Sequence, residues 1–83
     1  MTQKITILGS TGSVGVNTLD VLSLHPARFE VFALSAAVQV DLMLAQCRRF
    51  KPVFAVMASV HHSQLLAEKI RDHQLSTQVL SGP

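Results

Sequence analysis

The sequence predicts an α/β fold: a Rossmann-like parallel sheet whose elements follow one another in the order β-α-β-α-β-α-β. Two observations support this prediction. Short β-branched and apolar runs alternate with longer segments of helical period, and a glycine-rich turn joins the first strand to the first helix. Strands that alternate with helices in this way form parallel sheets through right-handed crossovers. Such a chain is a fragment of a doubly wound dinucleotide-binding domain.

The first predicted strand and helix lie on either side of the turn. Residues 4–8 are short, β-branched and apolar and stop at Gly9, which predicts a buried strand. Residues 13–24 predict a helix that ends before Pro26. We expect its apolar face to consist of Val14, Leu19, Val21 and Leu22.

The second strand and helix are predicted at residues 30–35 and 40–50. The helix has Asp41 in its first turn and Arg48 and Arg49 in its last, the order that the helix dipole favours. Apolar residues at i, i+3, i+4 and i+7 predict its buried face: Val40, Met43, Leu44 and Cys47.

The third strand is predicted at residues 53–57, the third helix at 62–73 with Leu66 and Ile70 on one face, and a fourth strand at 77–80. The chain stops just after this strand, where another helix would be expected. We therefore expect residues 1–83 to be the amino-terminal part of a longer nucleotide-binding domain. Catalytic and carboxy-terminal domains would lie beyond residue 83.

The composition of the chain is apolar for its size. Its 83 residues are 48% hydrophobic and 14% charged, whereas ordinary soluble domains have about 25% charged residues. We expect part of the apolar surface to be covered by further chain or by a partner. The net charge is +2, most cations are scattered, and Trp and Tyr are absent. These features argue against nucleic acid as a partner.

The chain also lacks signals for secretion or membrane insertion. Cys47 is its only cysteine, so no internal disulfide can form and a reducing compartment is favoured. No apolar run approaches the roughly 20 residues that span a bilayer, and strand-like sequence begins at Lys4 without a preceding signal peptide. We expect a cytoplasmic protein that does not associate with membranes.

Glycines recur at i, i+3 and i+6 between Gly9 and Gly15, a variant of the dinucleotide-binding fingerprint in the required place between a strand and a helix. We expect Gly9 to allow a sharp turn, Gly12 to let a pyrophosphate approach the backbone, and Gly15 to let the helix pack closely on the sheet. The free N–H groups of the helix start would bind the phosphates. Hydroxyl donors or a helix cap would come from Ser10, Thr11 and Ser13. The alternative is a tight turn that binds no ligand.

The end of the second strand should face the ribose of the nucleotide. In NAD enzymes an Asp or Glu about 20 residues after the turn binds the 2′-hydroxyl. Here Ala37, Val38 and Gln39 follow the strand, and Glu30 lies at its other end. Nothing in this segment would repel a 2′-phosphate, so NADP fits better than NAD, although no Lys or Arg is there to attract it. Ser35 and Gln39 are the only nearby polar side chains, and a solvated loop is the alternative for both.

The other chemically active side chains do not form a catalytic pattern. Cys47 lies on an apolar helix face and is expected to be a small core residue. The four histidines lack the spacing of metal ligands, and the acids on helices are expected to lie on solvated faces. These residues are His25, His61, His62 and His73, with Asp20, Asp41, Glu68 and Asp72. We predict no catalytic residue and no metal ligand within this chain.

Short segments around the turn and along nearly the whole chain have a family-like spacing. They are Ile7 to Gly15, Thr18-Leu19-Asp20-Val21, His25-Pro26, Phe29, Val31, Ala33-Leu34, Gln46-Cys47, Phe50, Pro52, Ala55-Val56 and Val79-Leu80-Ser81-Gly82. In these segments the chain resembles the amino terminus of the 1-deoxy-D-xylulose 5-phosphate reductoisomerase family. This resemblance is far more specific than the glycine pattern alone.

The resemblance implies an NADPH-dependent enzyme of non-mevalonate isoprenoid biosynthesis. Family members rearrange the carbon skeleton of a sugar phosphate and reduce the resulting aldehyde, which gives 2-C-methyl-D-erythritol 4-phosphate. They need Mg²⁺ or Mn²⁺ and are homodimers. The family's metal and substrate ligands would lie beyond residue 83, and the 83-residue chain alone is expected to be inactive. The resemblance also implies that the NADPH pyrophosphate is lined by Thr11, Gly12, Ser13 and Val14.

One segment departs from the family pattern. The family often has Gly, then Lys or Arg, then Asn facing the 2′-phosphate end of the cofactor, where this chain has Ala37, Val38 and Gln39. Gln39 can still form a hydrogen bond, but a charge-assisted contact is lost, worth about 1.5–3 kcal/mol where it is well formed. The strength of the preference for NADP is therefore open.

Two other functions remain. A different NADP-linked dehydrogenase, such as a semialdehyde dehydrogenase, has a similar turn, but Thr18-Leu19-Asp20-Val21 followed by His25-Pro26 argues against it. A catalytic Cys further along the chain would favour that enzyme, and clustered Asp and Glu would favour the reductoisomerase. A non-catalytic nucleotide-binding module would instead be a short, soluble product that binds nucleotide.

Overall fold

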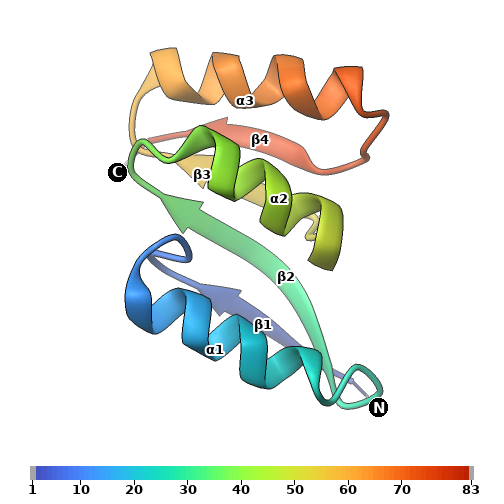
Figure 1. The fold of residues 1–83 in the computed structure, drawn as a ribbon. Coiled ribbons are helices and arrows are strands. Elements are labelled where there is room, and N and C mark those ends of the chain that lie inside the picture. Colours follow the sequence, from blue (N-terminus) through green and yellow to red (C-terminus); the bar gives the residue numbers. More distant parts are fainter. Residues whose placement is uncertain (1, 83) are drawn as a thin grey trace.

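The computed structural model describes residues 2–82, which form a parallel sheet of four strands with a helix between successive strands (Figure 1). This confirms the predicted fold class and element order. Helix α2 has the predicted bounds, and every other element begins or ends one or two residues away from its prediction. The elements are β1 (Gln3–Ile7), α1 (Ser13–Ser23), β2 (Phe29–Ala36), α2 (Val40–Phe50), β3 (Phe54–Met57), α3 (Val60–Asp72) and β4 (Gln78–Ser81).

The strands lie in the order β1-β2-β3-β4, each parallel to the next. Because every right-handed crossover moves one strand in the same direction, the three helices share one face of the sheet. In Figure 1, α1 and α2 lie in front of the sheet, and α3 lies along β4. The core fills the space between this helical layer and the sheet. Its buried hydrophobic residues are Ile7, Leu19, Val31, Leu34, Ala36, Met43, Cys47, Ala55, Met57, Leu66 and Ile70.

Within residues 2–82, no helix covers the opposite face of the sheet. Because side chains alternate along a strand, the neighbours of buried Val31 and Ala55 point to this face. The rings of Phe32 and Phe54 meet there edge to face, with 5.5 Å between centroids, and the ammonium group of Lys4 lies 5.5 Å from the Phe32 centroid. The apolar surface that further chain or a partner is expected to cover would include this side of the sheet.

Helix α1 buries a narrower face than the sequence predicts. Leu19 is buried and Leu22 partly buried, but Val14 is 80% exposed and Val21 58% exposed, so the prediction that these two valines face the core is wrong. Gly15, Leu19 and Leu22 form the stripe of α1 that faces the sheet. Val14 and Val21 each precede a residue of that stripe by one position, so they form a second stripe rotated by about 100° around the helix axis. Since α1 lies beside the edge strand β1, no other element of residues 2–82 covers that second stripe.

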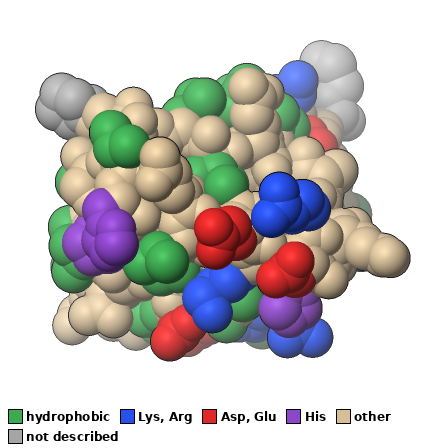
Figure 2. Space-filling model, turned by 90° about the horizontal axis from the view of Figure 1, so that it is seen from above, with side chains coloured by type: hydrophobic (Ala, Val, Ile, Leu, Met, Phe, Trp, Pro, Cys, Tyr) green, Lys and Arg blue, Asp and Glu red, His purple; other side chains and the backbone are tan. Residues whose placement is uncertain are grey.

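The surface above α3 has a different character at each of its ends (Figure 2). Basic and acidic side chains are intermixed with a histidine toward one end, whereas hydrophobic side chains and further histidine atoms lie toward the other. Lys69 pairs with Asp41 across 3.7 Å, and both side chains are substantially exposed. One end of this face therefore carries charges of both signs close together.

Candidate nucleotide-binding site

The glycine-rich turn follows β1 at the edge of the sheet where the strands have their carboxyl ends. Gly9 has a φ of 68°, a left-handed conformation that glycine adopts without a steric cost. Its N–H donates to the hydroxyl of Ser35 across 3.2 Å, and its carbonyl accepts from the Gly12 N–H across 3.0 Å. The sharp turn predicted at Gly9 is confirmed.

Ser10 is completely buried beneath this turn. Its N–H donates to the Ser35 carbonyl across 2.8 Å, and its own carbonyl accepts from the side-chain Nε2 of Gln46 across 2.7 Å. The Ser10 hydroxyl faces the sulfur of Met43 at 4.0 Å. Ser10 therefore anchors the turn from inside, and the expectation that its hydroxyl would face a ligand is wrong.

Gly12 and Gly15 are glycines for different reasons. A Cβ atom on Gly15 would overlap with the Gly9 carbonyl oxygen and would lie 2.7 Å from the Ser10 Cα. This agrees with the predicted close packing, but the contact is with the turn backbone that leaves β1. A Cβ on Gly12 would meet only the Gly9 oxygen, at an ordinary 3.5 Å, and its φ of −79° suits any residue. Nothing in residues 2–82 requires a glycine at position 12, so the open space beside it is available to a ligand.

The start of α1 presents unpaired backbone donors. Gly12 is the N-cap residue and forms no side-chain cap, so the expectation that a serine or threonine hydroxyl caps this helix is wrong. Within residues 2–82, the backbone N–H groups of Thr11, Ser13 and Val14 have no acceptor. The first turn of the helix also contains no acidic residue. Free N–H groups at the positive end of a helix dipole form a binding site for an anion such as phosphate.

The segment after β2 lies at the same edge of the sheet. Ala37, Val38 and Gln39 are exposed, Val38 by 53%. Gln39 is the N-cap residue of α2, but its side chain forms no cap hydrogen bond. The amide side chain of Gln39 is thus free to contact a ligand, and no cation accompanies it in this segment.

A shallow depression of about 400 Å³ connects the two segments. Gly9 and Ala37 both line it, but Thr11, Gly12, Ser13, Val14, Val38 and Gln39 do not. The depression is mainly apolar and continues past Val56 to Ala58 and Gly82, the residues that follow β3 and β4. The structure thus brings the start of the turn near the segment after β2, as expected for a nucleotide that crosses the carboxyl edge of a parallel sheet.

Two residues that organise the turn were not predicted from the sequence. Ser35 was expected near the ribose, but its hydroxyl accepts from Gly9 beneath the turn. Gln46 lies on the buried face of α2, 36 residues from the carbonyl that it contacts. The role of Gln46 could have been suspected from the sequence, because this polar residue lies between the predicted core positions Leu44 and Cys47. A buried polar side chain needs a hydrogen-bond partner.

Cys47 is a core residue, as predicted. It is fully buried, and burial raises the pKa of its thiol from 9.0 to about 11, with an opposing contribution from Thr77. A thiol with this pKa is protonated at neutral pH and is not a nucleophile.

The histidines and acids likewise form no candidate centre. His62 donates its backbone N–H to Ser59 Oγ across 3.2 Å, and its ring lies 2.6 Å from the same oxygen, which makes the pair a cap for α3. Among residues 2–82, no three side chains of His, Cys, Asp or Glu lie close enough to hold a metal ion. In the same range, no helix has the length and apolar character needed to cross a membrane.

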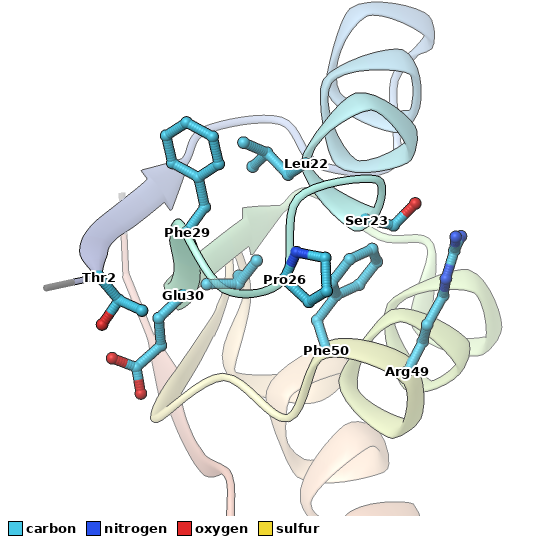
Figure 3. A pocket seen from close by; sticks show the side chains of 9 residues that line it. Thr2, Leu22, Ser23, Pro26, Phe29, Glu30, Arg49 and Phe50 are labelled. Atoms are coloured by element: carbon cyan, nitrogen blue, oxygen red, sulfur yellow. The ribbon is translucent and has the colours of Figure 1, made fainter.

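Another hollow, of about 630 Å³, lies at the opposite edge of the sheet (Figure 3). It opens between the end of α1, the start of β2 and the end of α2, and Glu30 and Arg49 are its charged residues. None of the predicted site residues lines it. In open α/β sheets ligands bind outside the carboxyl ends of the strands, so the glycine turn is the stronger candidate despite its smaller volume.

Almost the whole chain is similar to proteins of one known family. A family model described as 1-deoxy-D-xylulose 5-phosphate reductoisomerase matches residues 5–83. The protein of that name from Nitrosospira multiformis is 53% identical over 80 residues, which are 96% of this chain and 20% of that protein. The protein from Aromatoleum aromaticum is 46% identical over 81 residues, 98% of this chain and 20% of that protein. The chain thus spans about one fifth of the length of these curated relatives.

The fold agrees with solved structures at the same coverage. A crystal structure of DOX-P reductoisomerase in complex with NADPH, fosmidomycin and magnesium superimposes with a TM-score of 0.91 at 38% identity. The match covers 96% of this chain and 19% of that one. A TM-score of 0.91 means that the backbone of this chain follows that of the crystal structure over almost all of the described residues.

Proposed function

Because the chain belongs to the 1-deoxy-D-xylulose 5-phosphate reductoisomerase family, we propose that residues 1–83 are the amino-terminal part of its NADPH-binding domain. In this proposal, Thr11, Gly12, Ser13 and Val14 hold the pyrophosphate of NADPH. Ala37, Val38 and Gln39 face its 2′-phosphate end. The catalytic and carboxy-terminal domains are contributed by chain beyond these residues.

The observation that carries the proposal is the open space at Gly12. The protein itself leaves room for a Cβ atom there, at 3.5 Å from its nearest neighbour, and the backbone conformation does not demand glycine. The N–H groups of Thr11, Ser13 and Val14 surround this position without acceptors in residues 2–82. A diphosphate would accept from these donors and would occupy the space that a side chain would fill.

When bound, NADPH supplies the hydride for the reduction. The residues of this chain bind and orient it. The turn holds the diphosphate through hydrogen bonds from backbone N–H groups, which carry their proton at any physiological pH. At the ribose end Gln39 offers one amide, and no Lys or Arg stands beside it in the segment after β2. We therefore propose a cofactor site that derives its affinity mainly from the pyrophosphate.

The activity proposed for the complete protein is that of the family: conversion of 1-deoxy-D-xylulose 5-phosphate to 2-C-methyl-D-erythritol 4-phosphate for isoprenoid biosynthesis. A relative in complex with NADPH, fosmidomycin and magnesium supports NADPH and Mg²⁺ as cofactors. Mn²⁺ as an alternative metal, a homodimer and a cytoplasmic location are further parts of this proposal. Residues outside this chain would hold the metal and the sugar phosphate.

Substitution of Gly12 tests the proposal in the complete polypeptide that carries these residues. Gly12→Ala and Gly12→Val should weaken NADPH binding by about tenfold or more, increasingly with side-chain size, since each added carbon competes with the phosphates. Binding is measured by fluorescence titration of NADPH, and folding by thermal denaturation. Ala27→Val, at the exposed opposite edge of the sheet, is the matched control for added bulk. A folded Gly12→Val protein with unchanged NADPH affinity would disprove the proposed site.

A further inference from the structure

Gln46 is a polar residue in a position that suits a hydrophobic one. It lies on the buried face of α2 between Met43 and Cys47, both completely buried, and is itself only 7% exposed. Its side-chain Oε1 is buried and has no hydrogen-bond partner among residues 2–82. A buried amide with one unsatisfied end opposes folding, so the packing of α2 does not account for this residue.

The other end of the Gln46 amide has a specific partner. Nε2 donates to the backbone carbonyl of Ser10 across 2.7 Å, well within hydrogen-bond range. Ser10 is completely buried, and its N–H is held by the Ser35 carbonyl of β2. The two polar groups of the Ser10 backbone are therefore fixed by two different elements, and α2 reaches the turn through Gln46.

This hydrogen bond also sets the direction of a group that faces away from α2. The carbonyl of Ser10 and the N–H of Thr11 belong to one planar trans peptide, in which the two bonds point in opposite directions. A donor that fixes the Ser10 carbonyl toward α2 thus turns the Thr11 N–H away from α2. That N–H has no acceptor within residues 2–82.

We propose that Gln46 is a positioning residue for the cofactor: it orients the Ser10–Thr11 peptide so that the Thr11 N–H points at the pyrophosphate. This inference rests on the proposed function of the turn. The buried amide would thus pre-organise the turn for the cofactor. The unpaired Oε1 lowers the folding stability in exchange.

The test is Gln46→Met in the complete polypeptide, because methionine fills a similar volume but cannot donate to Ser10. We expect the Kd and KM of NADPH to rise about five- to tenfold, the value of one hydrogen bond, with kcat nearly unchanged. Thermal stability should change little, because removal of the unsatisfied Oε1 offsets the loss of the donor to the buried Ser10 carbonyl. Gln46→Glu should weaken NADPH binding at neutral pH and should also lower the stability, because a buried carboxylate has no proton to donate to Ser10.

Leu44→Ala separates positioning from general loosening of α2. Leu44 is partly buried against the core on the same helix and has no hydrogen bond to the turn. This variant should lose stability while keeping the affinity for NADPH. If Gln46→Met is stable and binds NADPH as the wild type does, the positioning role is wrong. If Gly12→Val binds normally as well, the proposed cofactor site itself fails; if only Gln46→Met does, the cofactor site survives without this residue.

Discussion

The backbone N–H of Gly9 donates to the hydroxyl oxygen of Ser35 across 3.2 Å. The two residues are 26 positions apart, in the turn after β1 and near the end of the neighbouring strand β2. Gly9 has a left-handed φ of 68°, and the bond holds its peptide in that conformation. A serine on β2 thus stabilises the turn that follows the neighbouring strand β1.

Ser35→Ala should lower the free energy of unfolding by about 1 kcal/mol, because the Gly9 N–H loses its acceptor. NADPH affinity should fall as well, since the turn would be less rigid. Ser35→Thr keeps the hydroxyl and serves as the control. Urea denaturation followed by circular dichroism measures the stability. Equal stability of the Ala and Thr variants would show that this bond does not hold the turn.

Gly15→Ala should destabilise the protein by about 1–3 kcal/mol, the usual cost of overpacking. The new methyl group would overlap with the Gly9 carbonyl and lie 2.7 Å from the Ser10 Cα, both of them backbone atoms that cannot rotate away. Gly12→Ala is the matched control, because its methyl group has only an ordinary contact. The two variants should therefore differ in the urea midpoint, and similar midpoints would contradict the packing described for α1.

Val38→Lys should strengthen NADPH binding by up to about fivefold and leave NADH binding unchanged. Val38 is 53% exposed, and a lysine there would place a cation near the proposed 2′-phosphate position. The gain is modest because exposed ion pairs contribute about 0–1 kcal/mol, and it should shrink at high salt. Isothermal titration with both cofactors measures the effect, with Val38→Met as the uncharged control. An equal gain for NADH would place the 2′-phosphate elsewhere.

The stability of the protein should fall with pH between about 9 and 11 because of Cys47. Its thiol has a pKa of 9.0 when exposed and about 11 when buried in the core. In this window the unfolded chain loses the proton while the folded protein keeps it, so ionisation favours the unfolded state. The accumulated loss approaches roughly 2–3 kcal/mol at the upper end of the window. Below pH 9 both states keep the proton and the contribution is fully present.

Cys47→Ala is the control for this pH dependence. The variant should be less stable at neutral pH because it leaves a cavity, but its free energy of unfolding should decline less between pH 9 and 11. The difference between the two pH profiles isolates the contribution of the thiol. Parallel profiles would mean that the thiol titrates alike in the folded and unfolded states.

The fold was predictable because its signals are local. The bounds of α2 were predicted correctly because its apolar period and the charges at its two ends agree, from Asp41 to Arg49. The strand ends were displaced by one residue because pairing decides them: Gln3 belongs to β1 because it pairs with Phe29 of β2. The sequence near Gln3 does not show which residue of another strand it pairs with.

The site was predictable only in part. The glycine spacing identified the turn, and its position between β1 and α1 is confirmed. The roles of Ser10, Ser35 and Gln46 depend on contacts between residues 25 to 36 positions apart. Periodicity and spacing carry no information about such contacts. The apolar surface of α1 was misassigned for a related reason, since the helix lies beside an edge strand and only one of its apolar stripes meets the sheet.

Each strand pairs with the strand that follows it in the chain, and the groups that hold the glycine turn come from β2 and α2. During synthesis the amino terminus leaves the ribosome first. The turn emerges before Ser35 and Gln46 exist to hold it, so it has no fixed shape at that moment. We expect it to become ordered only when α2 has emerged and docked, before the later residues of the chain fold beside it.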